Sequence, residues 1–377
     1  MQRISPKKTD RKHQRTAKEY DLLPLFEKFI LDSKKGRRLQ PNGNRISTGT
    51  ITNYLSCYRV LEYFARTKKF KLRVRTVRRL NQREMNTEKT YWKKFRHQFS
   101  NHLYHDCGYF DNYVGMIFKN LKVFFNYLNR EVSLGVGEFH KSFYVAKEEI
   151  AIFPLLPEEL HFLIYDKSFE QTLTPRLREV KDFFVFGCTV ALRFSDLVAL
   201  RKENIRIVNG DYYLAVRSIK TNVDSLIKLP NYAVDILHRQ SRRKRNLLPV
   251  FNIVNLNKYI KILLESAGFT NPVHITRNRR GDAVVLCNTG EIKYAGARRF
   301  CDVATTHTMR RTAITTMLSL GVNEQLVRKI SGHSASGREF YRYVLWAQTY
   351  QDRETQQMFN KLASLKSSEN TEIGENR

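Results

Sequence analysis

The sequence contains few cysteines, no long apolar run and none of the common nucleotide-binding motifs. Its five cysteines are scattered and never form a C-x-x-C pair, which gives no sign of a disulfide framework or a cysteine-based zinc site. No run of about 18 apolar residues occurs, and the N-terminus is polar and basic, so we expect no membrane span and no secretory signal. The G-x-x-x-x-G-K-[ST] motif is also absent. These absences predict a reduced, cytoplasmic protein, and nothing in the sequence requires a metal or other cofactor.

Acidic residues are scarce relative to basic ones. The chain has 66 Lys and Arg against 36 Asp and Glu, a net charge of +30 and a pI near 10.0. Residues 1–150 carry 32 basic and 14 acidic side chains (+18), and the remainder carries 34 and 22 (+12). Such an excess indicates either a polyanionic partner, for which nucleic acid is the default, or an unusual basis for solubility; if the partner is a polyanion, both halves should touch it. A hydrophobic content of 42% predicts ordered cores.

The first third of the chain has the pattern of a small helical domain. Apolar residues recur at helical spacing in segments that begin at Leu22, at the Ser47/Thr48 cap, at Thr87 and at Tyr109. Between the second and third helices lies a basic segment in which residues 70–75 alternate as in an extended strand. We expect its cations to bind DNA: Lys68, Lys69, Lys71, Arg73, Arg75, Arg78 and Arg79.

The rest of the chain predicts a second, mixed domain. A buried helix over residues 176–189 leads to Arg193, and the period then switches to two. Residues 205–208, 212–219 and 225–229 should form a three-stranded antiparallel sheet, with a turn at Asn209-Gly210. Residues 231–265 should be helical apart from a basic cluster, and residues 273–304 should be irregular. The cluster and the irregular segment offer further candidate DNA contacts: Arg242, Arg243, Arg279 and Arg280.

The stretch from His307 to Tyr343 concentrates the residues with chemical potential. A helix that starts at His307 would place His307 and Arg310 on one face, and Gly321 would end it. Asn323 can cap a second helix, which Gly332 should end just before His333. A histidine three residues before an arginine is common at a solvated helix start, so this motif is weak by itself.

The combination of motifs is specific. Arg193 in A-L-R-F-S-D-L, His307 and Arg310 in H-T-M-R, His333 in G-H and then Tyr343 occur in this order. The set resembles the active-site pattern of the tyrosine recombinase (phage integrase) family. The sequence departs mildly from the family pattern at Ala191, where glycine is usual, and at Ser331, where leucine is usual.

The resemblance implies a fold and a division of the chain. It implies a mainly α fold with a small antiparallel β-sheet (α+β), in which a helical core-binding (SAM-like) domain precedes the catalytic domain. The expected boundaries are as follows: a basic flexible arm at 1–20, the core-binding domain at 21–132, a linker at 133–153, the catalytic domain at 154–348, and a C-terminal helix and polar tail at 349–377.

The chemistry of these residue types suits phosphoryl transfer. Two guanidinium groups, Arg193 and Arg310, can bind the oxygens of a phosphodiester whose charge grows in the transition state. His307 and His333 can donate or carry protons near neutral pH. The resemblance implies that Lys220 protonates the leaving 5′-oxygen. It also implies a 3′-phosphotyrosyl intermediate, with no need for metal or ATP. Asp196 is expected to orient its neighbours or to cap its helix.

Two tyrosines compete for the role of nucleophile. Tyr341 and Tyr343 lie eight and ten residues after His333, and the commonest family spacing falls between them, at Arg342. The string F-Y-R-Y-V is similar to the F-x-[KR]-Y-[IV] form of family members, which favours Tyr343 and leaves Tyr341 as the alternative.

The resemblance also implies partners and leaves alternatives open. The expected partners are double-stranded DNA recombination sites, accessory DNA-bending or directionality factors, and further copies of the chain. Four copies would form a nucleoid-associated tetrameric synapse and exchange C-terminal helices. Integration or excision of a mobile element is favoured over chromosome-dimer resolution or inversion. The remaining alternatives are a non-catalytic DNA-binding accessory protein of the same fold, and a basic helical nucleic-acid-binding or ribosome-associated protein whose motif matches are accidental.

Overall fold

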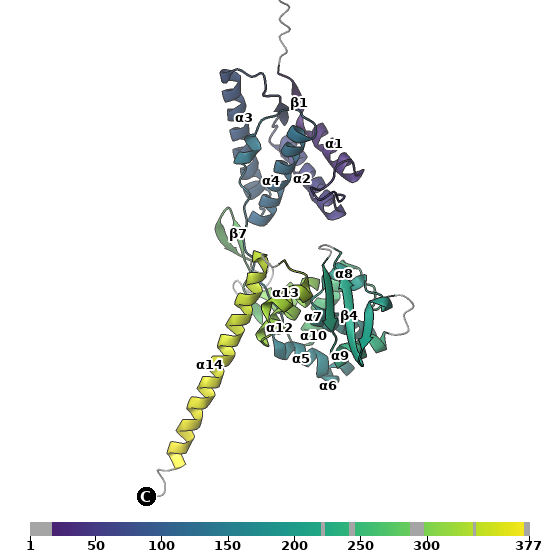
Figure 1. The fold of residues 1–377 in the computed structure, drawn as a ribbon. Helices are drawn as coiled ribbons and strands as arrows, with labels where there is room; N and C mark the ends of the chain where they lie inside the picture. Colours follow the sequence, from purple (N-terminus) through teal and green to yellow (C-terminus); the bar gives the residue numbers. More distant parts are fainter. Residues whose placement is uncertain (1–16, 220–222, 241–245, 287–297, 335–336, 373–377) are drawn as a thin grey trace, which may run out of the picture. The chain divides into compact units, whose positions relative to one another are not determined.

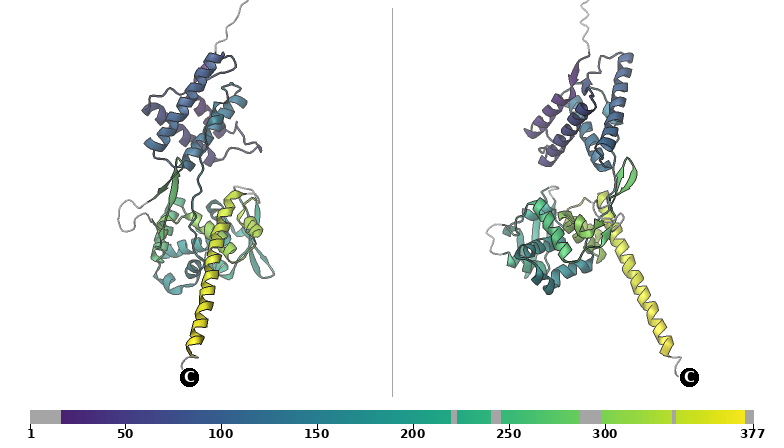
Figure 2. Two further views of the ribbon diagram at one scale, coloured as in Figure 1. Left: turned by 90° about the vertical axis from the view of Figure 1, so that its left-hand side faces the viewer. Right: turned by 180° about the vertical axis from the view of Figure 1, so that it is seen from behind.

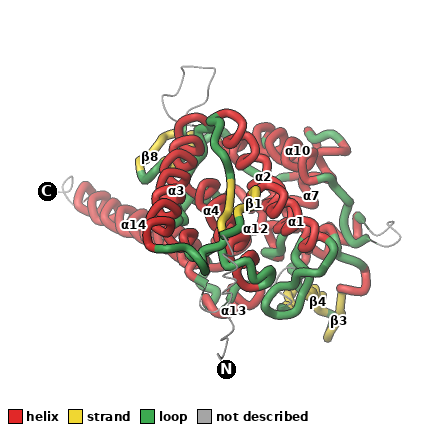
Figure 3. Tube along the Cα trace, turned by 90° about the horizontal axis from the view of Figure 1, so that it is seen from above, coloured by secondary structure: helices red, strands yellow, loops and turns green. Residues whose placement is uncertain are grey.

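The chain forms two compact units built mainly from helices (Figures 1 and 3). The computed structural model describes residues 17–219, 223–240, 246–286, 298–334 and 337–372. Unit 1 comprises residues 1–150 and 276–285, and unit 2 comprises residues 151–275 and 286–377. The described strands form small antiparallel sheets. The predicted α+β class is therefore confirmed.

Unit 1 is a four-helix domain around an aromatic core. Two short strands, β1 (Glu19–Asp21) and β2 (Arg73–Arg75), pair antiparallel beside the helices. The rings of Phe26, Phe29 and Phe124 pack together with centroids 4.6 to 5.6 Å apart, and all three side chains are fully buried. The helices of unit 1 are α1 (Leu22–Lys34), α2 (Thr48–Thr67), α3 (Gln82–Asn101) and α4 (Asp111–Arg130).

Helix caps explain where these helices begin. Ser47 accepts a hydrogen bond from the backbone N–H of Thr50, as the sequence predicts for the start of α2. Helix α3 starts five residues before the predicted Thr87, because Asn81 and Glu84 form a reciprocal capping box. The sequence prediction followed the apolar stripe and so missed this polar first turn.

The segment predicted to be irregular contains an ordered hairpin that packs with unit 1. Strands β7 (Thr276–Arg279) and β8 (Asp282–Val285) pair antiparallel, with Thr276 opposite Val285. Arg280 and Gly281 form the turn with φ of +58° and +91°. The prediction of irregular structure is therefore wrong for these ten residues. It failed because the segment has no alternating apolar pattern.

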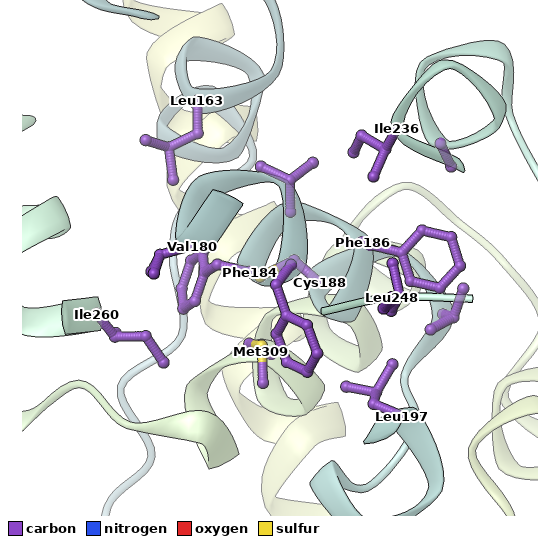
Figure 4. Packing of buried hydrophobic residues seen from close by; sticks show 14 of the residues in the cluster. Leu163, Val180, Phe184, Phe186, Cys188, Leu197, Ile236, Leu248, Ile260 and Met309 are labelled. Atoms are coloured by element: carbon purple, nitrogen blue, oxygen red, sulfur yellow. The ribbon is translucent and has the colours of Figure 1, made fainter. Parts of the chain in front are cut away.

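Unit 2 surrounds the buried helix α7 (Figure 4). Phe183, Phe184 and Phe186 of α7 are fully buried, and Met309 packs in the same cluster. The helices that precede residue 270 are α5 (Pro157–Tyr165), α6 (Lys167–Thr172), α7 (Pro175–Val190), α8 (Phe194–Val198), α9 (Asn231–Arg239) and α10 (Ile253–Ser266). The helices that follow are α11 (Phe300–Val303), α12 (Thr306–Ser319), α13 (Glu324–Ser331) and α14 (Tyr341–Glu372).

The predicted three-stranded sheet is present in unit 2. Its order is β3 (Ile205–Val208), β4 (Asp211–Arg217) and β5 (Asp224–Lys228), and both pairs are antiparallel. A second pair joins β6 (Pro272–Val273) to β9 (Arg298–Arg299). The turn after β4, where Lys220 falls, lies outside the described residues.

Helix α14 begins at Tyr341, eight residues before the predicted start, so both candidate tyrosines lie in its first turn. It packs against α12 through Tyr343 and Ala347 and then runs away from the other helices of unit 2 (Figure 2). No helix in the described part of the chain is both long and apolar enough to span a membrane.

Candidate active site

The end of α7 places Arg193. Helix α7 stops at Ala191, which adopts a left-handed conformation (φ +56°) and is fully buried. This conformation costs a non-glycine residue roughly 1 kcal/mol, which explains why glycine would suit the position. The Ala191 carbonyl accepts a hydrogen bond of 2.8 Å from Nη1 of Arg310. Arg193 follows as the residue that precedes α8, so the strained turn brings the two arginines of the predicted set together.

Asp196 links Arg193 to the sheet. Its carboxylate accepts hydrogen bonds from the Ser218 hydroxyl (3.3 Å) and from the backbone N–H of Ile219 (3.0 Å). The same hydroxyl accepts a bond from Nη1 of Arg193 (3.2 Å). Asp196 is 2% exposed. The contacts therefore hold the chain immediately before Lys220 at a fixed distance from Arg193.

Arg310 is the buried cation of the site. It lies on the second turn of α12, is 6% exposed, and points Nη2 at the ring nitrogens of His333, 3.3 and 3.4 Å away. Burial and then the charge of Arg193 lower the pKa of Arg310 to about 10, while Tyr343 and Asp196 oppose the shift. Arg310 still carries its charge at neutral pH. Because the charge of Arg193 contributes to this shift, the two guanidinium groups lie near one another, and such a pair can bind two oxygens of one anion.

His333 sits at the end of α13 because Gly332 can take the left-handed C-cap conformation (φ +63°). Its Nδ1 lies 2.8 Å from Oγ of Ser331, and that hydroxyl already donates to the carbonyl of Val327 (2.6 Å). The Ser331 oxygen therefore accepts a hydrogen bond from Nδ1–H of His333, which leaves Nε2 as the acceptor that faces Arg310.

The charge state of His333 follows from its surroundings. Burial and the nearby cations, Arg310 first and Arg193 next, lower the pKa of His333 to about 3. The imidazole is thus neutral at physiological pH, and its free nitrogen faces the guanidinium of Arg310.

The two candidate nucleophiles differ sharply in their surroundings. Tyr343 is 5% exposed, and its ring packs 5.9 Å from that of His333 and 5.7 Å from that of Phe340. It is also close enough to Arg310 and Arg311 to influence the pKa of both. Tyr341 is 60% exposed on another face of the same turn. Only Tyr343 therefore shares the surroundings of the predicted cations.

The two remaining predicted catalytic residues are His307 and Lys220. His307 is exposed in the first turn of α12, one turn before Arg310. Its backbone N–H donates to the Thr305 hydroxyl, which caps the helix. Lys220 lies outside the described residues.

The basic segment of unit 1 contains cations of two kinds. Arg73 binds Glu88 (2.7 Å), whose side chain is 1% exposed, and Lys68, Lys71 and Arg75 pair with other carboxylates of the unit. The pairs of Arg73 and Arg75 fasten the strand β2 to α3. Lys69, Arg78 and Arg79, by contrast, are exposed and form no ion pair with a described carboxylate.

The other predicted DNA contacts also fall into two groups. Arg279 donates to the carbonyl of Gly108 (3.0 Å), and Arg280 donates to the side chain of Asn101 (3.0 Å), so both make contacts inside unit 1. Arg242 and Arg243 lie outside the described residues.

Sequence reasoning missed three features of the molecule. Ser218 bridges Arg193 to Asp196, and Ser331 orients His333, but an isolated serine gives no local signal of either role. The third feature is a hollow of about 330 Å³ in unit 1 whose lining includes Lys93, Arg96 and Arg280 and no carboxylate. The spacing of Lys93 and Arg96 on one helical face could have indicated it.

Comparisons with known proteins place a family domain over the same part of the chain. Residues 179–345 match the sequence model of the phage integrase family. This segment contains Arg193, His307, Arg310, His333 and Tyr343. A phage integrase family domain therefore spans residues 179–345 of the chain.

Solved structures of similar fold extend over both units. A lambda integrase dimer bound to a COC′ core site matches with a TM-score of 0.56 at 13% identity, covering 86% of this chain and 77% of that one. The XerH site-specific recombinase in a post-cleavage complex with palindromic difH matches with a TM-score of 0.54 at 12% identity, covering 88% and 94%. A lambda integrase tetramer on a Holliday junction matches with a TM-score of 0.52 at 15% identity, covering 84% and 77%. No curated protein sequence is significantly similar to the chain.

Proposed function

We propose that the protein is a site-specific DNA recombinase that cleaves and rejoins DNA strands through a 3′-phosphotyrosyl intermediate, and that Tyr343 is its nucleophile. The observation that carries the proposal is the convergence of Arg193, Arg310, His333 and Tyr343 from four separate elements of unit 2. An accessory DNA-binding protein would have no need of this set.

The proposed reaction uses each residue in a distinct role. Arg193 and Arg310 bind the non-bridging oxygens of the scissile phosphate and stabilise the charge that develops on them. The Tyr343 oxygen attacks phosphorus and forms a phosphotyrosyl bond, while the bond to the 5′-oxygen breaks and Lys220 gives that oxygen a proton. The imidazole of His307 accepts and returns the tyrosyl proton, while neutral His333 accepts a hydrogen bond from Arg310 and so orients that guanidinium. Reversal of these steps with a new 5′-hydroxyl rejoins the strand.

The burial of Tyr343 supports a conformational step before attack. A side chain that is 5% exposed cannot reach a phosphate on duplex DNA without movement of the first turn of α14. We propose that DNA binding exposes Tyr343 by shifting this turn.

Helix α14 supports the proposal that copies of the chain assemble on DNA. Its distal half exposes three large apolar side chains, Met358, Phe359 and Leu362, each about half exposed. Such a stripe suits packing on a neighbouring copy. The similar structures are a dimer and a tetramer on DNA, which supports a tetrameric synapse with exchanged helices. A role in integrating or excising a mobile element remains our preferred biological context, with chromosome-dimer resolution or inversion as the alternative.

The decisive experiment tests covalent attachment to DNA. The protein is incubated in EDTA with nicked duplexes that carry the ends of its native element, and covalent complexes are resolved on a denaturing gel. We expect a covalent band for the wild type and for Tyr341→Phe, and none for Tyr343→Phe. Loss of the band only in Tyr341→Phe would move the nucleophile to Tyr341. Tight binding to the site without a band in any variant would support the accessory-protein alternative.

A further inference from the structure

The backbone passes between the two units at three places, and all three leave unit 1 at one location. The crossings follow Ile150, Ile275 and Val285. The second and third are adjacent because Thr276 pairs with Val285 in the hairpin. The first is joined to them by the side chain of Glu148, two residues before the crossing.

The backbone of Glu148, in the linker, is hydrogen-bonded to helix α4 of unit 1. Its backbone N–H donates to the side chain of Asn112 (3.1 Å), and its carbonyl accepts from the same side chain (3.0 Å), at the start of α4. One turn later, Gly115 leaves room for the linker, since a Cβ at that position would lie 2.0 Å from the carbonyl oxygen of Ala146. The linker is therefore fixed to α4 as far as Glu148.

The carboxylate of Glu148 holds the hairpin. It accepts two hydrogen bonds from the guanidinium of Arg277 (2.6 and 3.0 Å) and one from the backbone N–H of Asn278. The Glu148 side chain is 1% exposed and that of Arg277 is 22% exposed. An ion pair with this burial and geometry is stronger than a surface pair, and removal of one partner leaves buried donors without an acceptor.

A second carboxylate holds the tip of the hairpin. Asp111 accepts from the backbone N–H groups of Arg280 (2.7 Å) and Gly281 (3.1 Å). The hairpin adds no residue to the fully buried apolar core of unit 1. Its attachment therefore depends on polar contacts that single substitutions can break.

We propose that Glu148 is a positioning residue that binds the linker and the hairpin together, so that three chain crossings act as one restrained hinge between the two units. The effect of this hinge on DNA binding rests on the proposed function. If both units bind the same duplex, a restrained hinge raises the effective concentration of one unit once the other has bound.

The first test measures opening of the hairpin in the free, full-length protein. Hydrogen exchange of the amides in residues 276–285 should be about tenfold faster or more in Glu148→Gln and in Arg277→Gln, since each loses charged hydrogen bonds. The double variant should be no worse than the worse single variant, because both changes break the same pair. The matched control is Glu138→Gln, which removes the charge of an exposed carboxylate of unit 1 that pairs with Lys141.

Two outcomes of this test would overturn the proposal. Unchanged exchange in the hairpin would show that Glu148 does not hold it. Equal acceleration throughout α1–α4 would show that Glu148 only stabilises unit 1. Small-angle scattering of the free chain should also show a broader distance distribution in Glu148→Gln, and an unchanged distribution despite an open hairpin would show that the hairpin is no restraint.

A second test connects the hinge to the reaction. On the nicked duplexes described above, Glu148→Gln should need several times more protein to reach half-maximal covalent complex, with an unchanged rate at saturation. A lower rate at saturation, with unchanged half-maximal concentration, contradicts a positioning role. If no variant forms a covalent complex, the proposed function fails, while the exchange and scattering results still decide the hinge.

Discussion

Individual side chains in the candidate site depend on neighbours that are distant in the sequence. The neutral state of His333 is one example, because it arises from burial and from cations contributed by α8 and α12. Its tautomer is another, since it follows from Ser331 and the carbonyl that Ser331 already binds. A change at any of these positions should alter how the histidine exchanges protons.

The stability of unit 2 should report the low pKa of His333. The pKa in the folded state, about 3, lies below the ordinary value of 6.5, so the unfolded chain binds a proton first as pH falls. Keeping His333 unprotonated in the folded state costs no free energy of unfolding above pH 6.5. This cost grows as the pH falls below 6.5. We expect the free energy of unfolding to drop more between pH 7 and pH 5 in the wild type than in His333→Asn, as measured by denaturant titration. Equal drops in the two proteins would contradict the burial of a neutral imidazole.

Secondary-structure elements follow local rules except where another segment must fit against them. Helix α4 is an example, because the linker lies directly on it at Gly115. Gly49 in helix α2, by contrast, faces open space, because a Cβ at this position would meet no atom within 4 Å. The two positions therefore predict opposite outcomes for the same substitution.

Gly115→Ala should destabilise unit 1, while Gly49→Ala should not. The Gly115 methyl would overlap a backbone carbonyl, which cannot move as a flexible side chain can, so we expect a loss of about 2 kcal/mol or more. Gly49→Ala should gain roughly 0.5 to 1 kcal/mol from helix propensity. Thermal and denaturant unfolding of the full chain measure both. A neutral Gly115→Ala would show that the linker does not pack against α4.

At the scale of the whole molecule, helix α14 serves two purposes along its length. Its first turns are part of unit 2, where Tyr343 and Ala347 are buried and Gln351 donates to the carbonyl groups of Leu318 and Ser319. Its distal half has exposed apolar side chains instead. Folding and assembly should therefore be separable.

A chain that ends at Glu354 should fold normally but fail to form higher-order complexes on DNA. We expect its free energy of unfolding to lie within about 0.5 kcal/mol of the wild type, as is usual for changes on an exposed surface. Native gels and sizing of protein–DNA complexes should show the loss of the multimer. Two full-length variants serve as a matched pair. The double variant Met358→Ser/Phe359→Ser should lose the multimer as the shortened chain does, and the control Gln356→Ser should keep it. Persistence of the multimer in the shortened chain would place the contact between copies elsewhere.

The sequence by itself determined the fold class, most helices of both units, the three-stranded sheet and the presence of a phage integrase family domain. These features depend on local patterns: apolar periodicity, caps such as Ser47 and Asn323, and motifs in a fixed order. The roles of Arg193, Lys220, His307, Arg310, His333 and Tyr343 in the reaction stay predictions.

Only the tertiary structure decided which charged residues are bound inside the protein and which are free to meet a ligand. Arg73 and Arg79 are equivalent in the sequence, yet the first binds buried Glu88 and the second is exposed. Glu148 and Arg277 lie 129 positions apart, and neither has a local feature that indicates the other. The physical reason is that charge pairing depends on distance and burial in three dimensions, whereas helix and strand periodicity depend on neighbours along the chain.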